Sequence, residues 1–177
     1  ELNFALLGPA QNQSMLELEI HDYNYSNLSE VDSIKGFAMF INMSKFSEIG
    51  FFDENIFLYL EEIDLCKRIK NINEKIYLDA SIKIFHAGGK SVDEKFSYEV
   101  ELTRNWHWMW SKFYFKKKHY GYLKAFLTSF PILTTSAIKF FYYFITNNKF
   151  KEKIYIMRLL GLLNSMLGKK SWYRPQV

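Results

Sequence analysis

The chain has 177 residues, of which 49% are hydrophobic and 19% are aromatic, and its net charge is +4. This composition indicates a folded chain long enough to bury a core, and so small a charge argues against a basic nucleic-acid binder. The single cysteine, Cys66, excludes an internal disulfide framework and a cysteine-rich zinc site. Its apolar neighbours predict a buried small side chain. A single cysteine also fits a reducing cytoplasmic setting.

The first part of the chain predicts an α/β arrangement. Apolar or alternating runs predict strands, and polar runs predict loops. The expected strands are 4–9, 15–20 and 36–41, the last of them central in the sheet, and the expected loop is 24–29. Ser44 is expected to cap a short helix that ends at Gly50.

A second helix is predicted from Glu61 or Glu62 to about Lys70. Its acidic residues fall in the first turn and its basic residues in the last, which matches the helix dipole. Asp64 and Arg68 are four residues apart on this helix, so we expect them to pair. Two further strands, at 75–79 and 81–85, are predicted after it.

From about Glu94 onward the chain shows only helical periods, and breaks are expected at Gly121, at Pro131 and at 147–148. The region is rich in aromatic residues and lysine. Residues 125–145 are apolar, but Pro131, Lys139 and several hydroxyl side chains interrupt them, which argues against a membrane span. Helices that lie on a membrane surface and helices that pack as an appendage both fit the pattern.

The acidic pair Glu61 and Glu62 has two interpretations. A carboxylate at the start of a helix, beside an aromatic loop, can act as the general base that deprotonates an attacking hydroxyl group. The same pair can simply complement the positive end of the helix dipole, which is common on surface helices. Spacing alone does not separate these interpretations.

His86 follows the predicted strand 81–85 and precedes Ala87-Gly88-Gly89. Glycines let other groups approach closely, and a neutral imidazole is a good ligand for a divalent ion. A hydrogen-bonded structural histidine is the alternative. The aromatic residues of the second half recur at helical spacing between aliphatic residues, so they predict core or membrane contacts rather than nucleic-acid stacking.

Taken together, these motifs resemble the C-terminal half of a family 2 glycosyltransferase, in the rhamnosyltransferase-like branch that builds bacterial surface polysaccharides. The resemblance covers roughly residues 4–91. It rests on four motifs in family order: Leu7-Gly8-Pro9, Val31-Asp32-Ser33-Ile34-Lys35-Gly36, Gly50-Phe51-Phe52-Asp53-Glu54 with Tyr59-Leu60-Glu61-Glu62-Ile63-Asp64-Leu65-Cys66-Lys67-Arg68, and His86-Ala87-Gly88-Gly89-Lys90-Ser91. It implies the α/β GT-A fold, with a mixed sheet and helices, followed by an all-helical aromatic and basic tail.

The resemblance also implies roles for five residues. Glu62 falls at the position of the family's catalytic base, while Glu61, Asp32 and Asp64 would bind the acceptor. His86 would bind Mn²⁺ or Mg²⁺ beside the donor diphosphate. The implied reaction is inverting transfer of a sugar from a nucleotide-sugar to a glycan or polyprenyl-linked acceptor, in a protein peripheral to the cytoplasmic face of the cell membrane.

Two substitutions and one absence set the chain apart from the family. Glu62 replaces the usual Asp, and Ser33 stands where many relatives carry Trp. The family's nucleotide-binding strands and its Asp-x-Asp metal motif are not found. We therefore expect 1–93 to be the acceptor-side part of a GT-A domain and 94–177 a helical, membrane-proximal region. The 177 residues alone are expected to be inactive, and a non-catalytic binding or assembly module, or a decayed enzyme, is the alternative function.

Overall fold

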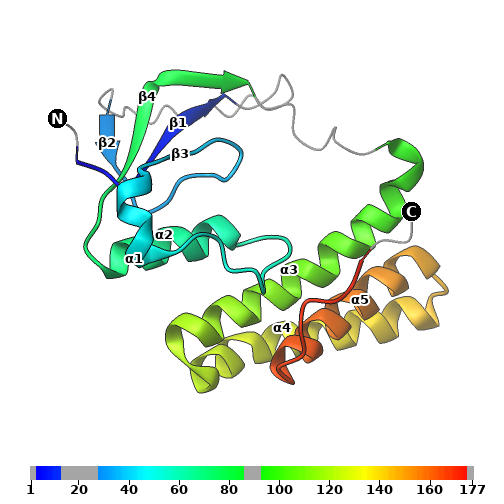
Figure 1. Ribbon diagram of the computed structural model, residues 1–177. Coiled ribbons are helices and arrows are strands. Elements are labelled where there is room, and N and C mark those ends of the chain that lie inside the picture. Colours follow the sequence, from blue (N-terminus) through cyan, green and yellow to red (C-terminus); the bar gives the residue numbers. More distant parts are fainter. Residues whose placement is uncertain (1–2, 13–27, 86–92, 175–177) are drawn as a thin grey trace. The chain divides into compact units, whose positions relative to one another are not determined.

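The computed structural model describes residues 3–12, 28–85 and 93–174. It divides the chain into two compact units, which are coloured along the sequence in Figure 1. The sheet unit comprises 1–53 and 61–91, and the helical unit comprises 54–60 and 92–177. The short segment 54–60 thus belongs with the helices, although it lies within the first half of the sequence. It stays a prediction that 1–93 is the acceptor-side part of a GT-A domain and that 94–177 is a membrane-proximal region.

The sheet unit is built on a mixed four-stranded sheet. Its strands are β1 (Leu6–Asn12), β2 (Leu28–Glu30), β3 (Phe40–Ile41) and β4 (Ile76–Phe85), and their order is β2-β4-β1-β3. β4 runs parallel to β1 and antiparallel to β2, while β3 lies antiparallel to β1. The α/β class with a mixed sheet is therefore confirmed for the described residues.

The predicted central strand at 36–41 was wrong. Only Phe40 and Ile41 pair, and they do so at the edge of the sheet. The residues before them form a turn around Gly36, and a glycine weakens a strand interior because it has no side chain to pack. Leu28–Glu30, whose first two residues were expected to be loop, pair with β4 instead. The predicted strand 15–20 lies outside the described residues.

The two strands predicted at 75–79 and 81–85 form one strand, β4. The pairing of β4 with β1 shifts register between Pro9 and Ala10. Pro9 has no backbone N–H to give to the ladder, which explains an irregularity at this point. On β4 the backbone N–H of Ser81 donates to Asp79 Oδ1 at 2.9 Å, a local turn that replaces the regular pairing.

Two helices complete the sheet unit: α1 (Phe46–Ile49) and α2 (Glu61–Asn71). Asn42, not Ser44, caps the 3₁₀ turn that leads into α1, because its side-chain oxygen accepts a hydrogen bond from the Ser44 N–H. α1 ends at Gly50 (φ 68°), and α2 covers the predicted range. The core between the helices and the sheet consists of Ala5, Leu6, Ile34, Phe46, Ile49, Leu65, Cys66, Ile69 and Ile76.

The helical unit contains α3 (Ser97–Tyr120), α4 (Tyr122–Ile145) and α5 (Lys149–Met166). Gly121 and 147–148 separate them as expected, but Pro131 lies inside α4 and does not end it. Pro131 is exposed, so water can replace the backbone hydrogen bond that proline cannot make. Among the described residues, none of the helices combines the length and apolar character that crossing a bilayer requires.

α3 and α5 approach each other closely at Gly161. A Cβ atom added there would lie 2.1 Å from the carbonyl oxygen of Trp106. No side chain fits into that space, so the crossing of these two helices depends on glycine. Below it, Met109 and Phe113 of α3 pack with Ala125 of α4 and Leu162 of α5.

α3 also carries a row of buried polar residues at four-residue spacing: Thr103, His107 and Ser111. The Ser111 hydroxyl donates to the Leu58 carbonyl at 2.8 Å, which holds the segment 54–60. His107 Nε2 lies 2.8 Å from the Tyr173 carbonyl and Nδ1 lies 3.0 Å from Ser171 Oγ. Since a carbonyl only accepts, Nε2 carries a proton, and in the neutral ring Nδ1 accepts from the hydroxyl group of Ser171.

Candidate functional site

The start of α2 carries the two carboxylates that the sequence singled out. Glu61 and Glu62 are the first two residues of the helix, where the free N–H groups and the helix dipole favour negative charge. Tyr59 and Leu60, directly before them, both have left-handed backbones, with φ of 68° and 69°. Such a conformation costs a bulky residue about 1–3 kcal/mol and is found preferentially at functional sites.

Glu62 lies against the segment 31–36 of the sheet unit. A Cβ atom added at Gly36 would lie 3.4 Å from Glu62 Cβ and 3.9 Å from its carboxyl carbon. One turn further along α2, the backbone N–H of Ile34 lies close enough to the Cys66 thiol to oppose the rise that burial gives to its pKa. The segment therefore follows the helix, and glycine at position 36 leaves the flank of the Glu62 side chain uncovered.

Glu61 differs from Glu62 in its surroundings. Burial raises the pKa of the Glu61 carboxyl group, its own backbone N–H opposes that shift, and the charge of Glu62 adds to it. Its Oε2 atom is buried and has no hydrogen-bond partner among the described residues. The site thus contains one half-buried carboxyl group with a raised pKa, next to a second carboxyl group on the same turn.

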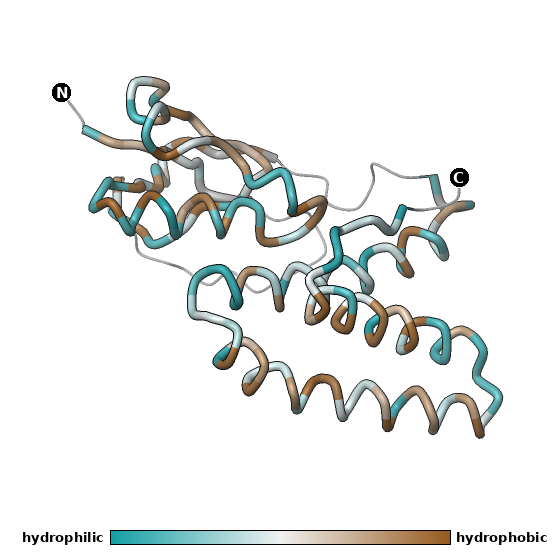
Figure 2. Tube along the Cα trace, turned by 60° about the horizontal axis from the view of Figure 1, so that its bottom comes forward, coloured by the Kyte–Doolittle hydropathy of each residue, from teal (hydrophilic) through white to brown (hydrophobic). Residues whose placement is uncertain are grey.

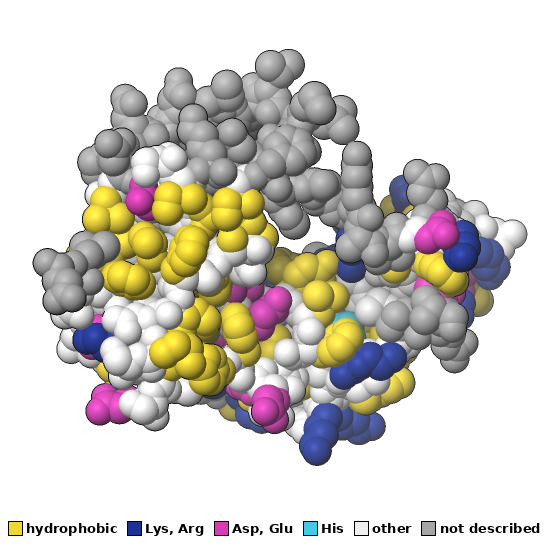
Figure 3. Space-filling model, turned by 45° about the horizontal axis from the view of Figure 1, so that its top comes forward, with side chains coloured by type: hydrophobic (Ala, Val, Ile, Leu, Met, Phe, Trp, Pro, Cys, Tyr) yellow, Lys and Arg dark blue, Asp and Glu magenta, His cyan; other side chains and the backbone are white. Residues whose placement is uncertain are grey.

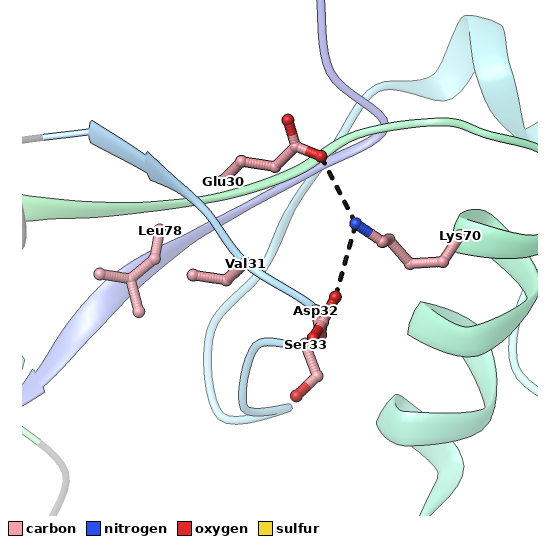
Figure 4. A pocket seen from close by; sticks show the side chains of 6 residues that line it. All are labelled: Glu30, Val31, Asp32, Ser33, Lys70 and Leu78. Carbon is pink, nitrogen blue, oxygen red and sulfur yellow. Dashed lines mark hydrogen bonds and ion pairs between the residues drawn. The ribbon is translucent and has the colours of Figure 1, made fainter.

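Asp32 lies in a separate open pocket of about 520 Å³, lined by Glu30, Val31, Asp32, Ser33, Lys70 and Leu78 (Figure 4). Lys70 Nζ points between the two acids, 3.4 Å from Glu30 and 3.5 Å from Asp32. Hydrogen bonding to Lys75 lowers the pKa of Glu30, and the Asp32 side chain is almost fully exposed. Neither Glu61 nor Glu62 lines this pocket, so the structure does not bring all the predicted acceptor residues together.

Asp64 is fully buried, and its Oδ2 accepts a hydrogen bond of 3.0 Å from Arg68 Nε. The predicted pair is confirmed. Arg68 also donates to the carbonyl oxygens of Ile49, Gly50 and Phe51, so it fastens the loop after α1 to α2. The Asp-Leu-Cys-Lys-Arg part of the motif therefore has a structural role, and contact of Asp64 with an acceptor stays a prediction.

His86 lies outside the described residues, so its predicted role as a metal ligand is untested. Within the described parts of the chain, no group of three His, Cys, Asp or Glu side chains is placed to hold a metal ion. The described residues therefore do not fit a complete Mn²⁺ or Mg²⁺ site, which needs several oxygen ligands in regular geometry.

The sequence interpretation missed the contact of Gly36 with Glu62, although its signal is present. A glycine at the end of an otherwise bulky motif segment indicates a close approach by another group. It also missed the buried row of α3, because His107 stands between two tryptophans and has the appearance of an aromatic core residue.

Comparison with known proteins gives a partial relationship. No protein-family model and no solved structure matches the chain. The chain is similar to the low-salt glycan biosynthesis hexosyltransferase Agl10 of Haloferax volcanii, with 35% identity over 79 residues, which cover 43% of this chain and 25% of that protein. The chain therefore spans about a quarter of the length of this relative. The match relates it to a glycosyltransferase, and the GT-A fold stays a prediction.

Proposed function

We propose that the chain is the acceptor-side part of an inverting glycosyltransferase, with Glu62 as its general base. The observation that carries the proposal is the pair of unlike carboxyl groups at the start of α2. Glu62 lies beside Gly36, and Glu61 has a buried, unpartnered oxygen and a raised pKa. The strained backbone before them and the similarity to a hexosyltransferase add support.

In the proposed reaction, the Glu62 carboxylate takes the proton of an acceptor hydroxyl group while that oxygen attacks the anomeric carbon of the donor sugar. The bond from the anomeric carbon to the nucleoside diphosphate breaks, and the configuration inverts. A positioned base of this kind contributes about 10²–10⁴-fold to the rate. Glu61, where protonated, donates a hydrogen bond to an acceptor oxygen and so orients it.

Asp32 and Ser33 would bind hydroxyl groups of the acceptor in the open pocket, and Asp64 would act through Arg68 by holding the loop after α1. The donor is a nucleotide-sugar, and the acceptor is a glycan or a polyprenyl-linked glycan of the cell surface. No step is assigned to a divalent ion, because the described residues hold no cluster of ligands for one.

The test is sugar transfer by the protein expressed from its complete reading frame. Radiolabelled nucleotide-sugars are offered with a polyprenyl-linked acceptor, and wild type is compared with Glu62→Gln, which keeps the size of the side chain and removes the base. We expect a loss of about 10²–10⁴-fold in kcat. Glu48→Gln, an exposed change on α1, is the matched control and should retain activity.

Glu62→Asp introduces the residue that the family 2 glycosyltransferases carry at this position, so this variant should remain active. An active Glu62→Gln enzyme would refute the role of Glu62. A protein that binds glycan yet transfers no sugar with any donor or metal would instead be a non-catalytic binding module, the alternative that the exchange of Asp for Glu at position 62 favours.

A further inference from the structure

Helix α4 carries large apolar residues on its outer face as well as toward the core of the helical unit, where Phe126, Ile132 and Leu133 pack. Its buried positions are Ala125, Ser129 and Ser136. Its exposed positions include Leu123, Ile138 and Ile145, whose exposed fractions are 70%, 68% and 79%. A surface helix in water normally carries charged and polar residues on the face opposite its apolar stripe. The outer face of α4 is therefore suited to an apolar medium.

The large exposed side chains lie on one face of α4, in two groups that the half-buried Thr134 separates. Leu123, Leu127, Phe130, Ile138, Phe141 and Ile145 follow one another at helical spacing, which places them on one face. At about 1.5 Å per residue the row is about 33 Å long. Figure 2 shows the hydrophobic positions recurring along α4, with hydrophilic segments at both ends of the helix. We call these six residues the α4 row.

The charge around the α4 row is mostly positive. Residues 102–177 contain fourteen Lys and Arg but one acidic residue, Glu152, whereas residues 1–101 contain nine basic and eighteen acidic residues. The net charge of +4 hides this asymmetry. Lysines stand at both ends of α4, at 116–118 and at 149–153, and α4 itself has no acidic residue. Figure 3 shows Lys and Arg side chains in several separate groups on the visible face.

We propose that the α4 row is a docking surface for an anionic lipid bilayer, with α4 lying in the interface and the flanking lysines at the level of the headgroups. An amphipathic helix binds such a surface through buried apolar area together with attraction to anionic lipids. Tyr122 and Tyr142, both exposed on α4, belong to the residue type that gathers at membrane–water interfaces.

Charge favours a bilayer over a second copy of the chain as the occupant. Two copies that met through this face would bring two surfaces of the same sign together, and like charges oppose association. An anionic bilayer complements the surface. The inference rests on the α4 row and the charge distribution, not on sugar transfer, so the two proposals can fail separately.

The test is sedimentation of the 177-residue chain with vesicles of phosphatidylcholine alone and of phosphatidylcholine with phosphatidylglycerol. We expect binding to the anionic vesicles that weakens with salt. Leu127→Glu and Ile138→Glu change exposed positions, so they should leave the circular dichroism spectrum unchanged and weaken binding about tenfold each. Ile72→Glu, an equivalent change at an exposed position in the sheet unit, is the matched control and should bind as wild type does.

A second measurement locates the contact. Cys66 is buried, so Ile138→Cys provides one accessible thiol for an environment-sensitive fluorophore. Its emission should shift to the blue with anionic vesicles, while a label at Ile72→Cys should not respond. Absence of vesicle binding, or binding that the α4 substitutions leave unchanged, would overturn the proposal. A dimer in solution that the same substitutions dissolve, without vesicle binding, would overturn it in favour of a second copy.

Discussion

Replacing Arg68 by alanine removes the cation that pairs with Asp64 and the donor for three backbone carbonyl groups. The Asp64 carboxylate is fully buried, and the side chain of Arg68 is 21% exposed. Removing one partner of a buried ion pair costs about 3–5 kcal/mol, because the remaining charge stays desolvated. Since Arg68 is partly open to solvent, we expect the lower end of that range, about 3 kcal/mol.

Cys66 supplies the assay, because it is 1% exposed and lies between Asp64 and Arg68 on the same helix. Its thiol reacts with a maleimide only when α2 opens, so the labelling rate follows the opening equilibrium. A cost of about 3 kcal/mol corresponds to labelling about a hundredfold faster. Tryptophan fluorescence reports separately on the helical unit, since all four tryptophans lie there.

Lys70→Ala is the control for this prediction, because Lys70 is also a cation on α2 but pairs with exposed acids. Exposed ion pairs contribute about 0–1 kcal/mol, so labelling should rise less than about fivefold. If Arg68→Ala labelled no faster than Lys70→Ala, the Asp64–Arg68 pair would not hold this unit together. Asp64 would then be better explained by a role in binding.

Two further predictions concern the helical unit. Gly161→Ala should lower the free energy of unfolding by about 1–2 kcal/mol, because overpacking against the Trp106 carbonyl outweighs the better helix propensity of alanine. A urea unfolding midpoint equal to that of the wild type would contradict the close crossing of α3 and α5. Burial holds the pKa of His107 below its usual value, against the opposing hydrogen bond to the Tyr173 carbonyl and with a further contribution from the Arg174 charge. The unfolded chain therefore takes up a proton as pH falls through about 6.5, and the folded chain takes it up only at lower pH. The free energy of unfolding of the wild type should therefore decrease as the pH is lowered. The difference in unfolding free energy between wild type and His107→Gln should narrow as the pH is lowered from about 7.5 to 5.5. A difference that stays constant over this range would contradict the prediction.

The sequence was sufficient to predict α2, because its charges, spacing and apolar positions all favour the same helix. It was insufficient at 36–41, where an apolar run indicated a strand but the turn at Gly36 limits pairing to two residues. Pro131 was wrongly expected to end a helix, since its exposure is a tertiary property. These errors share a cause: local pattern does not record what lies opposite a residue.

The candidate site could be predicted only in part, because local pattern places a residue on a helix but does not show its distant neighbours. Glu61 and Glu62 could be placed at a helix start from their neighbours alone. The contacts of Arg68 with the loop after α1, the position of Asp32 in a pocket that neither Glu61 nor Glu62 lines, and the approach of Gly36 to Glu62 all depend on residues distant in sequence. The partners of His107, more than sixty residues away, could not be inferred from the Trp106-His107-Trp108 run.

The segment 54–60 ties the folding of the helical unit to the other half of the sequence. A bundle of three helices with short connections ordinarily folds fast, because its contacts are local in the chain. Here the Ser111 hydroxyl group donates to the Leu58 carbonyl, and the Arg174 guanidinium lies over the Phe57 ring, 3.6 Å from its centroid. The bundle is therefore complete only when 54–60 and the segment after α5 have both packed against it. A polypeptide cut at 92 would release helices that lack one of their own packing elements. The unit is contiguous in space but discontinuous in sequence, and on a ribosome it cannot close until Arg174 has emerged.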